Sequence, residues 1–263
     1  MSDGLMVIGP WRLAAGYLLL LIPLGIMMWY KINLIGKTLI GIVRMTVQLL
    51  FVGFYLQVVF KANNVWLTLA WLVIMISVAD ISVIRHCNLR VSRFVLPLYL
   101  SLFVGTAVPV VFFVGLILTE PTLLEAQYVI PIGGMVLGNC LRADVIGLAG
   151  FYNSIKDNEK SFLQSLAYGA SVYEAVEPYF RKSFRMALLP TITMMSTVGL
   201  VSLPGMMTGV ILAGASPVNA IAYQIAIMIS IFTGTSITIV MVILLTVRKC
   251  FDEYGLLKKD IFA

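Results

Sequence analysis

The sequence predicts an all-α integral membrane protein with about seven transmembrane helices. Two features of composition support this class. Of the 263 residues, 60% are hydrophobic and 11% are charged, and the mean hydropathy is +1.01. A soluble domain has roughly 45–50% apolar and about 25% charged residues. The third observation is that the apolar residues gather in runs of about 20, the length that crosses the hydrocarbon core as a helix.

Seven stretches are long enough to span a bilayer. They cover residues 13–30, 39–60, 65–84, 94–118, 128–150, 188–212 and 218–247. Fourteen of the 18 Lys and Arg residues fall in connections that would share one side, whereas the other side holds Arg12 and Lys61. Since short cytoplasmic loops are rich in Lys and Arg, we expect the N-terminus outside and the C-terminus inside. This accounts for the net charge of +6 without a nucleic-acid partner.

We expect a single transmembrane permease domain, 1–263, with one long cytoplasmic loop at 153–187, between spans five and six. Apolar side chains recur in this loop at helical spacing, which predicts amphipathic helices. Ser171 and Glu174 fit a capping box, so a helix should begin there. Pro178 suits the first turn of a further helix, which predicts a short helix from 172 to 177 before it.

Two roles are open for this loop. It could rest on anionic lipid as an interfacial helix, or it could receive a cytoplasmic partner. Glu174 and Glu177 favour the partner, because an anionic leaflet would repel them. The residues expected to couple to such a partner are Gly169, Ser171, Glu174, Glu177 and Pro178.

Four ionisable residues lie inside expected spans, where charges are costly and often functional. Arg44, Asp80, Arg142 and Asp144 all fall in the cytoplasmic third of their helices. Two positive and two negative charges at one depth predict an intramembrane network that neutralises itself. A gate or a substrate contact near the inner mouth is the alternative.

The run from Gly199 to Gly214 is apolar but carries a Pro-Gly pair, Pro204 and Gly205. This pair predicts a kink or a short unwound segment. Gly205, Gly209 and Ala213 would form a small-residue ridge for close helix packing. Discontinuous helices commonly form transport sites, and plain tight packing is the alternative. The residues expected along a substrate path are Gln48, Asn139, Arg142, Asp144, Ser202, Met206, Met207 and Gln224.

The sequence offers no energy source for transport. The stretch "KINLIGKT" ends like a phosphate-binding loop but has Lys31 in place of the first glycine. No nucleophile with a paired base is visible in the spans, so we expect no enzyme and no catalytic residues. The identity of any metal ligand is left open. Energy should come from another subunit, and a stand-alone secondary transporter or channel is the alternative.

Three segments resemble the FetB/YbbM family of ABC-transporter permeases. They are "PIGGMVLGNCLRADVIGLAG" (131–150), "SLAYGASVYEAVEPYFRKSFRMALLPTI" (165–192) and "VGLVSLPGMMTGVILAGASPVNAIAYQI" (198–225). The resemblance implies a permease that pairs with a separate cytoplasmic ATPase, which would bind ATP and Mg. It implies iron export and metal homeostasis, and related plant half-transporters are linked to aluminium tolerance and a nucleotide-sugar solute. We expect a homodimer, multi-pass in the inner (plasma) membrane and surrounded by lipid.

Overall fold

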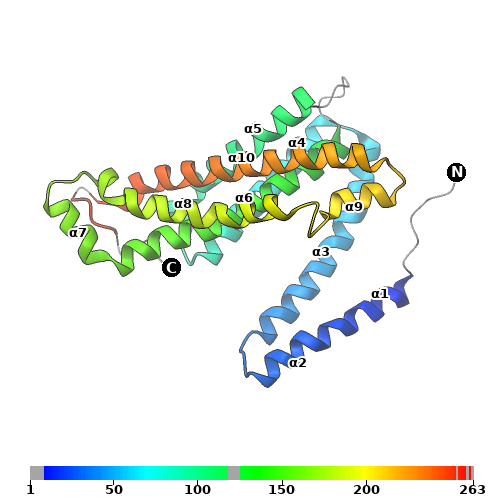
Figure 1. The fold of residues 1–263 in the computed structure, drawn as a ribbon, viewed down its shortest axis with the longest axis horizontal. Helices are drawn as coiled ribbons and strands as arrows, with labels where there is room; N and C mark the ends of the chain where they lie inside the picture. Colours follow the sequence, from blue (N-terminus) through cyan, green and yellow to red (C-terminus); the bar gives the residue numbers. More distant parts are fainter. Residues whose placement is uncertain (1–8, 118–124, 253, 259–260, 262–263) are drawn as a thin grey trace.

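The computed structural model describes residues 9–117, 125–252, 254–258 and 261, and the regular elements in this part are helices. Figure 1 shows a long bundle and an N-terminal hairpin that points away from it. The elements are α1 (Pro10–Gly16), η1 (Tyr17–Leu20), α2 (Leu21–Trp29), α3 (Ile35–Ala62), α4 (Val65–His86), α5 (Val91–Phe112), η2 (Phe113–Ile117), α6 (Ala126–Asp157), α7 (Glu159–Ala167), α8 (Val172–Thr197), α9 (Gly205–Leu212) and α10 (Pro217–Cys250).

Six helices of the described part are long and apolar enough to cross a membrane. They are Trp11–Trp29, Ile35–Ala62, Val65–His86, Val91–Ile117, Ala126–Asp157 and Pro217–Cys250. The all-α membrane class is thereby confirmed, and each of the six coincides with an expected span, although Leu118 lies outside the described residues. The other expected span, 188–212, is divided, because α8 ends at Thr197 and α9 begins at Gly205.

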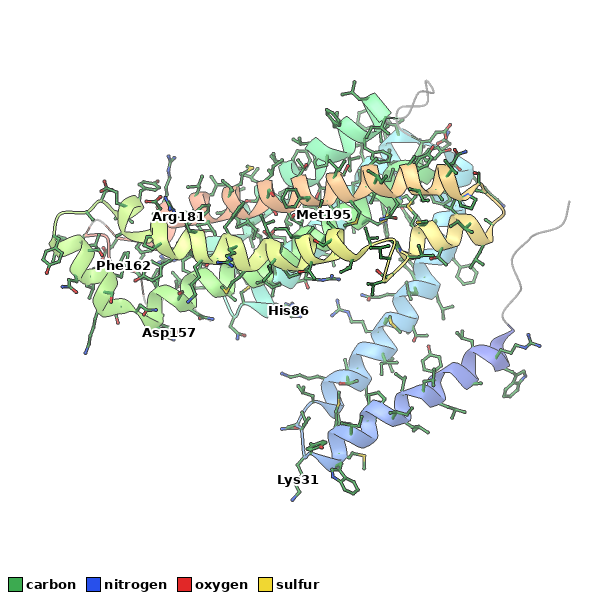
Figure 2. All side chains as sticks on the ribbon, in the orientation of Figure 1. Lys31, His86, Asp157, Phe162, Arg181 and Met195 are labelled. Atoms are coloured by element: carbon green, nitrogen blue, oxygen red, sulfur yellow. The ribbon has the colours of Figure 1, made fainter. Side chains whose placement is uncertain are left out.

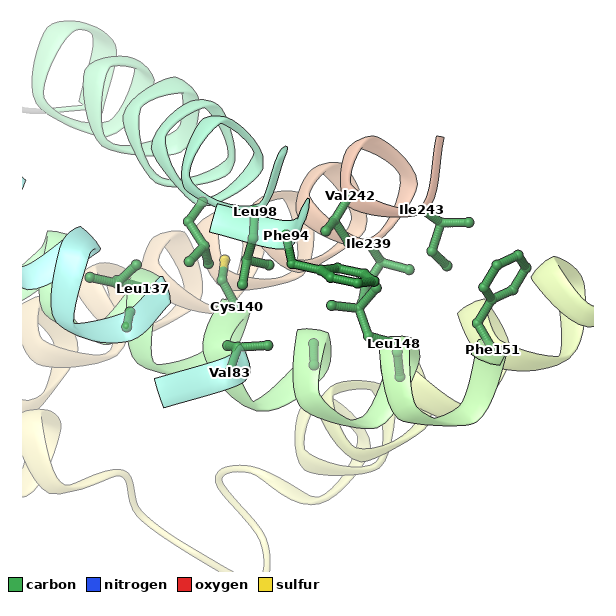
Figure 3. Close-up of a cluster of buried hydrophobic side chains, with 14 of the residues drawn as sticks. Val83, Phe94, Leu98, Leu137, Cys140, Leu148, Phe151, Ile239, Val242 and Ile243 are labelled. Atoms are coloured by element: carbon green, nitrogen blue, oxygen red, sulfur yellow. The ribbon is translucent and has the colours of Figure 1, made fainter. Parts of the chain in front are cut away.

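The core lies where α5, α6 and α10 meet. Gly105 of α5 faces Gly234 of α10 so closely that a Cβ added at Gly234 would lie 2.6 Å from the carbonyl oxygen of Gly105. Figure 3 shows the apolar side chains of this region packed together, with Cys140 of α6 among them. Two backbones can approach this closely because glycine has no side chain.

The N-terminal hairpin contacts the bundle at one end. Of the 28 residues of α3, all of them described, Val59 alone is buried. The ring of Tyr55 stacks on that of Trp71 in α4, with centroids 4.1 Å apart. Toward its N-terminus α3 leaves the bundle, and Lys31 lies at the distant tip of the hairpin (Figures 1 and 2).

The C-terminal segment packs at one end of the bundle. At the end that holds α7, the Arg90 N–H donates to the Ile261 carbonyl at 2.9 Å, and the rings of Phe162 and Phe251 lie 5.6 Å apart. The C-terminal segment therefore ties the α4–α5 turn to α7 and α10. The α9–α10 connection, residues 213–216, lies at the opposite end (Figure 1).

Candidate functional site

The chain leaves helical geometry between α8 and α9, over residues 198–204. Gly199 has a φ of 89°, a left-handed conformation that glycine adopts without steric cost. Its N–H donates to the Ser202 carbonyl at 2.9 Å. A continuous helix would direct this N–H to the carbonyl of Met195, four residues earlier. The break therefore releases the Met195 carbonyl from the helical hydrogen-bond ladder.

The unwound segment expected at Pro204 and Gly205 lies on their N-terminal side. Pro204 is extended, with φ −61° and ψ 145°, and forms the N-cap, while Gly205 is the first residue of α9. Proline suits this place, because a helix does not need its missing N–H there. The sequence thus located the interruption correctly to within one turn.

A cavity of about 220 Å³ lies between α6, α9 and the start of α10. Met206 and Met207 line it from α9, and Gln224 lines it from α10. These three residues of the expected substrate path therefore come together. Gln127, Tyr128 and Tyr223 complete the polar and aromatic part of the wall.

A second cavity, of about 420 Å³, lies beside the break itself. Met195 of α8, Met207 of α9 and Met228 of α10 line it, together with Gln224. Met207 and Gln224 thus belong to both cavities. The Gln224 side chain is 7% exposed, and its Oε1 has no hydrogen-bond partner among the described residues. Because an unpaired buried acceptor costs about 1–3 kcal/mol, it marks a place where a ligand or water would be stabilised.

Other residues of the expected path lie elsewhere. Asn139 and Arg142 of α6 line a small cavity of about 30 Å³ against α8, where Thr191 is a neighbour. The Asn139 amide donates to the Met135 carbonyl at 2.8 Å. Ser202 is exposed at the break.

Gln48 is also separate from the cavities. It is exposed on α3, 11 residues before Val59, the buried residue of that helix. The structure therefore joins Met206, Met207 and Gln224, and it leaves Gln48 and the α6 residues out of that group.

The expected network of four intramembrane charges is not formed in this structure. Arg44 is exposed on α3 and Arg142 is exposed on α6, whereas Asp80 and Asp144 are buried. Oδ1 of Asp80 and both carboxylate oxygens of Asp144 have no hydrogen-bond partner among the described residues. The physical reason is helix rotation: Arg142 and Asp144 are two residues apart, so their side chains diverge by about 200° around α6.

The small-residue ridge of α9 has no helix against it within the described chain. A Cβ added at Gly205 or Gly209 would meet no atom within 4 Å, and Ala213 is exposed. The expected packing role is therefore not realised among the residues that the structure describes. Close backbone approach occurs instead at Gly105 and Gly234, which sequence reasoning missed because no small-residue spacing links them.

The expected coupling residues lie at the end of the bundle that holds α7. Gly169, with φ 92°, ends the preceding turn, and Ser171 and Glu174 form the expected capping box. The Ser171 hydroxyl accepts from the Glu174 N–H at 3.3 Å, and the Ser171 N–H donates to the Glu174 carboxylate at 2.7 Å. The hydrogen bond from the Ser171 hydroxyl, and then that from its N–H, lower the pKa of Glu174.

The short separate helix at 172–177 is wrong. α8 runs without interruption from Val172 to Thr197 and contains both Pro178 and Pro190. Pro178 deprives the Glu174 carbonyl of its helical donor, but this carbonyl lies in an exposed first turn where water can replace the bond. Glu177 is held by Arg181, whose guanidinium lies 2.6 Å from the carboxylate.

Sequence reasoning missed part of the cavity walls. Tyr128, Tyr223 and Met228 were not singled out, and neither was Gln127. The signal available for Met228 was its spacing of four from Gln224, which places both on one face of α10. The others come from separate helices, so no spacing in the sequence connects them. Among the described residues, no group of three or more His, Cys, Asp or Glu could hold a metal ion.

Comparison with known proteins gives a consistent set of relatives. Residues 10–251 match the family described as "Uncharacterised protein family (UPF0014)". The chain is 34% identical to the UPF0014 membrane protein slr1647 of Synechocystis, over 88% of this chain and 89% of the relative. It is 31% identical to the probable iron export permease protein FetB of Escherichia coli, over 92% of each.

A plant relative is also similar over much of its length. Identity to the protein ALUMINUM SENSITIVE 3 of Arabidopsis thaliana is 32%, over 80% of this chain and 76% of the relative. No solved structure gives a significant match.

Proposed function

Because the chain belongs to the UPF0014 family of membrane proteins, we propose that it is the permease subunit of an ABC transporter. It would export iron or another metal-related solute, using a separate ATPase. The relative named as a probable iron export permease supports the transport role. The observation that carries the proposal is the interrupted helix between α8 and α9, flanked by two cavities that share Met207 and Gln224.

In this proposal α8, the break and α9 together make one crossing, which gives seven spans. Figure 1 supports this, because α8 and α9 together run along the bundle beside α10. An odd number of crossings places the termini on opposite sides, with the N-terminus outside and the C-terminus in the cytoplasm. The positive residues of the loop and tail agree with this orientation. The membrane would be the inner (plasma) membrane.

Coupling to ATP hydrolysis would enter through α7 and the first turns of α8. This region carries the capping box of Ser171 and Glu174, and Tyr173 accepts a hydrogen bond from Arg248 of α10 at 3.1 Å. A force applied to this end would therefore reach both α8 and α10, which line the cavity beside the break. ATP and Mg would be bound by the partner, and two permease chains would form a homodimer.

Co-purification tests the coupling. The tagged chain, expressed in its own host and extracted in mild detergent, should carry a cytoplasmic ATP-hydrolysing subunit with it. Changing Glu174→Lys and Glu177→Lys together should release that subunit. Glu125→Lys, which changes an acid at the N-cap of α6, is the matched control and should leave binding intact. Unchanged ATPase association in the double variant would exclude this end of the bundle from coupling.

A second candidate is a stand-alone secondary transporter. The observation that favours it is the pair of buried carboxylates, Asp80 and Asp144, whose oxygens lack partners among the described residues. Such groups suit proton coupling. Solute flux in proteoliposomes that contain this chain alone, driven by a pH gradient and abolished by Asp144→Asn, would select this function over the ABC permease.

A further inference from the structure

We infer that the cavity beside the α8–α9 break binds a soft, weakly hydrated monovalent cation of the Cu(I) or Ag(I) class. The inference rests on the proposed transport function and, of the solutes named there, selects another metal in place of iron. The cavity, which we call the methionine pocket, is the one lined by Met195, Met207, Gln224 and Met228.

The methionine pocket gathers thioethers from three separate helices. Met195 comes from α8, Met207 from α9 and Met228 from α10. Met207 and Met228 are 8% and 5% exposed, so water does not solvate these two side chains freely, whereas Met195 is 37% exposed. Thioether sulfur is a soft ligand that favours Cu(I) over hard divalent ions.

One side-chain oxygen lines the pocket, and one lining residue carries a backbone carbonyl released from the helix. Gln224 is more than nine-tenths buried, lines the cavity and has an Oε1 without a partner among the described residues. The Met195 carbonyl, released where Gly199 turns away, lies at the C-terminal end of α8. Such a helix end carries partial negative charge, and broken helices of transporters use it to coordinate cations.

The lining excludes a hard divalent ion on chemical grounds. The residues that line the methionine pocket are neutral, without carboxylate, imidazole or thiol. Fe²⁺ binds preferentially to carboxylate and imidazole groups. A divalent charge would also be far more costly to bury without counter-charge than a single one, since the desolvation penalty rises with the square of the charge.

The pocket also has a neighbour into which a cation could pass. Met207 and Gln224 form part of the wall of the 220 Å³ cavity, where Met206 supplies a further thioether and Tyr128 and Tyr223 supply aromatic rings. Aromatic faces attract cations. A cation could therefore exchange ligands across Met207 and Gln224 and move from one cavity to the other without meeting a fixed charge.

Silver binding tests the inference. Ag(I) is a redox-inert substitute for Cu(I), and its binding to the purified chain in chloride-free buffer can be measured by isothermal titration calorimetry. A Cys87→Ser background removes the half-buried thiol, whereas Cys140 and Cys250 are buried. We expect Met207→Leu and Met228→Leu each to lower affinity by about tenfold or more. Met241→Leu, on the same helix but outside the pocket, should not.

Gln224 allows a variant that keeps binding. Leucine at this position removes the oxygen donor, whereas methionine adds a thioether of similar size. We therefore expect Gln224→Leu to weaken Ag(I) binding and Gln224→Met to retain it. Because methionine and leucine differ little in volume, both variants should fold equally well, and the thermal unfolding midpoint of each variant checks this.

Two results would overturn the inference. One is Ag(I) affinity that is the same in the Met207→Leu, Met228→Leu and Met241→Leu variants. The other is anaerobic Fe²⁺ binding that is lost in the first two variants, which would assign the site to a divalent ion. The ABC function is tested separately: a chain that binds its ATPase but not Ag(I) retains the proposed function, and a chain that binds Ag(I) without any ATPase retains the pocket.

Discussion

The N-terminal hairpin and the bundle are both apolar, but they differ in packing. The most apolar 18-residue stretch of α3 has a mean hydropathy of 1.9 and no buried residue. The corresponding stretch of α6 has a lower mean hydropathy, 1.4, and half of its residues are buried. Hydropathy therefore identifies segments that tolerate lipid, and it does not identify which of them have helical neighbours. The surroundings of the glycines show the difference in packing. Gly105, Gly147 and Gly234 lie against other helices, whereas Gly41 and Gly53 of α3 have no atom within 4 Å of an added Cβ.

The largest expected effect comes from enlarging a bundle glycine. Gly234→Leu would force side-chain atoms into the Gly105 carbonyl and into Val136, so α5, α6 and α10 would have to separate. We expect the free energy of unfolding to fall by about 3 kcal/mol or more, at or above the top of the usual range for overpacking, because backbone atoms stand in the way. Thermal unfolding in detergent, followed by circular dichroism, measures this. A midpoint within 2 °C of the parent, about what less than 1 kcal/mol produces, would contradict the packing of α5 on α10.

The attachment of the hairpin should depend partly on the Tyr55–Trp71 pair, which packs against a small apolar cluster around Val59. Trp71→Ala removes the partner of Tyr55, and a stacked aromatic pair contributes about 0.5–1.5 kcal/mol beyond its area. We expect a broader distance distribution between spin labels at Asn33 and Asn153, with the unfolding midpoint of the bundle little changed. Trp66→Ala is the control, since Trp66 is 79% exposed on the same helix. An equally broad distribution for the control would show that the stack does not hold the hairpin.

A smaller effect is expected at the α7 end. Ser171→Ala removes the N-cap of α8 and should cost about 1 kcal/mol, measured by thermal unfolding against Ser161→Ala.

The capping box also gives a pH dependence. Because the folded-state pKa of Glu174 lies below its usual 4.5, the stabilisation is present above that value and is lost as pH falls through the lower pKa. A Ser171→Ala variant that keeps the full acid sensitivity would contradict this source.

The smallest effect is expected in the hairpin. Gly53→Ala places a methyl group where no atom lies within 4 Å, and alanine is favoured over glycine in a helix by about 0.5–1 kcal/mol. We therefore expect hairpin order to rise slightly, as slower amide hydrogen exchange in α3. Faster exchange would mean that another surface covers Gly53 and that the contrast between hairpin and bundle is incomplete.

Much of the fold could be predicted from the sequence, because its signals are local. Apolar runs gave six spans, the Ser171 and Glu174 spacing gave a helix start, and Pro204 with Gly205 gave an interruption. The helix boundary expected at Pro178 was wrong. Near an exposed helix start, water can replace the one helical hydrogen bond that a proline removes, so the helix continues.

The candidate site was less predictable, because it depends on how helices rotate and meet. Met207 and Gln224 were expected on one path and do share two cavities. Arg142 and Asp144 were also expected together, but they point to different sides of α6. The approach of Gly105 to Gly234 joins residues of two helices, so no pattern within one segment could indicate it.

Two contacts at the α7 end, Arg90 with Ile261 and Phe162 with Phe251, join the α4–α5 turn, α7, α10 and the C-terminal segment. Helices that are joined at one end can separate more at the other end. The end held in this way carries α7, and the opposite end carries α9, the 213–216 turn and the ring contact of Phe113 with Tyr223. A small rotation of α10 at the α7 end would thus become a larger displacement at its other end.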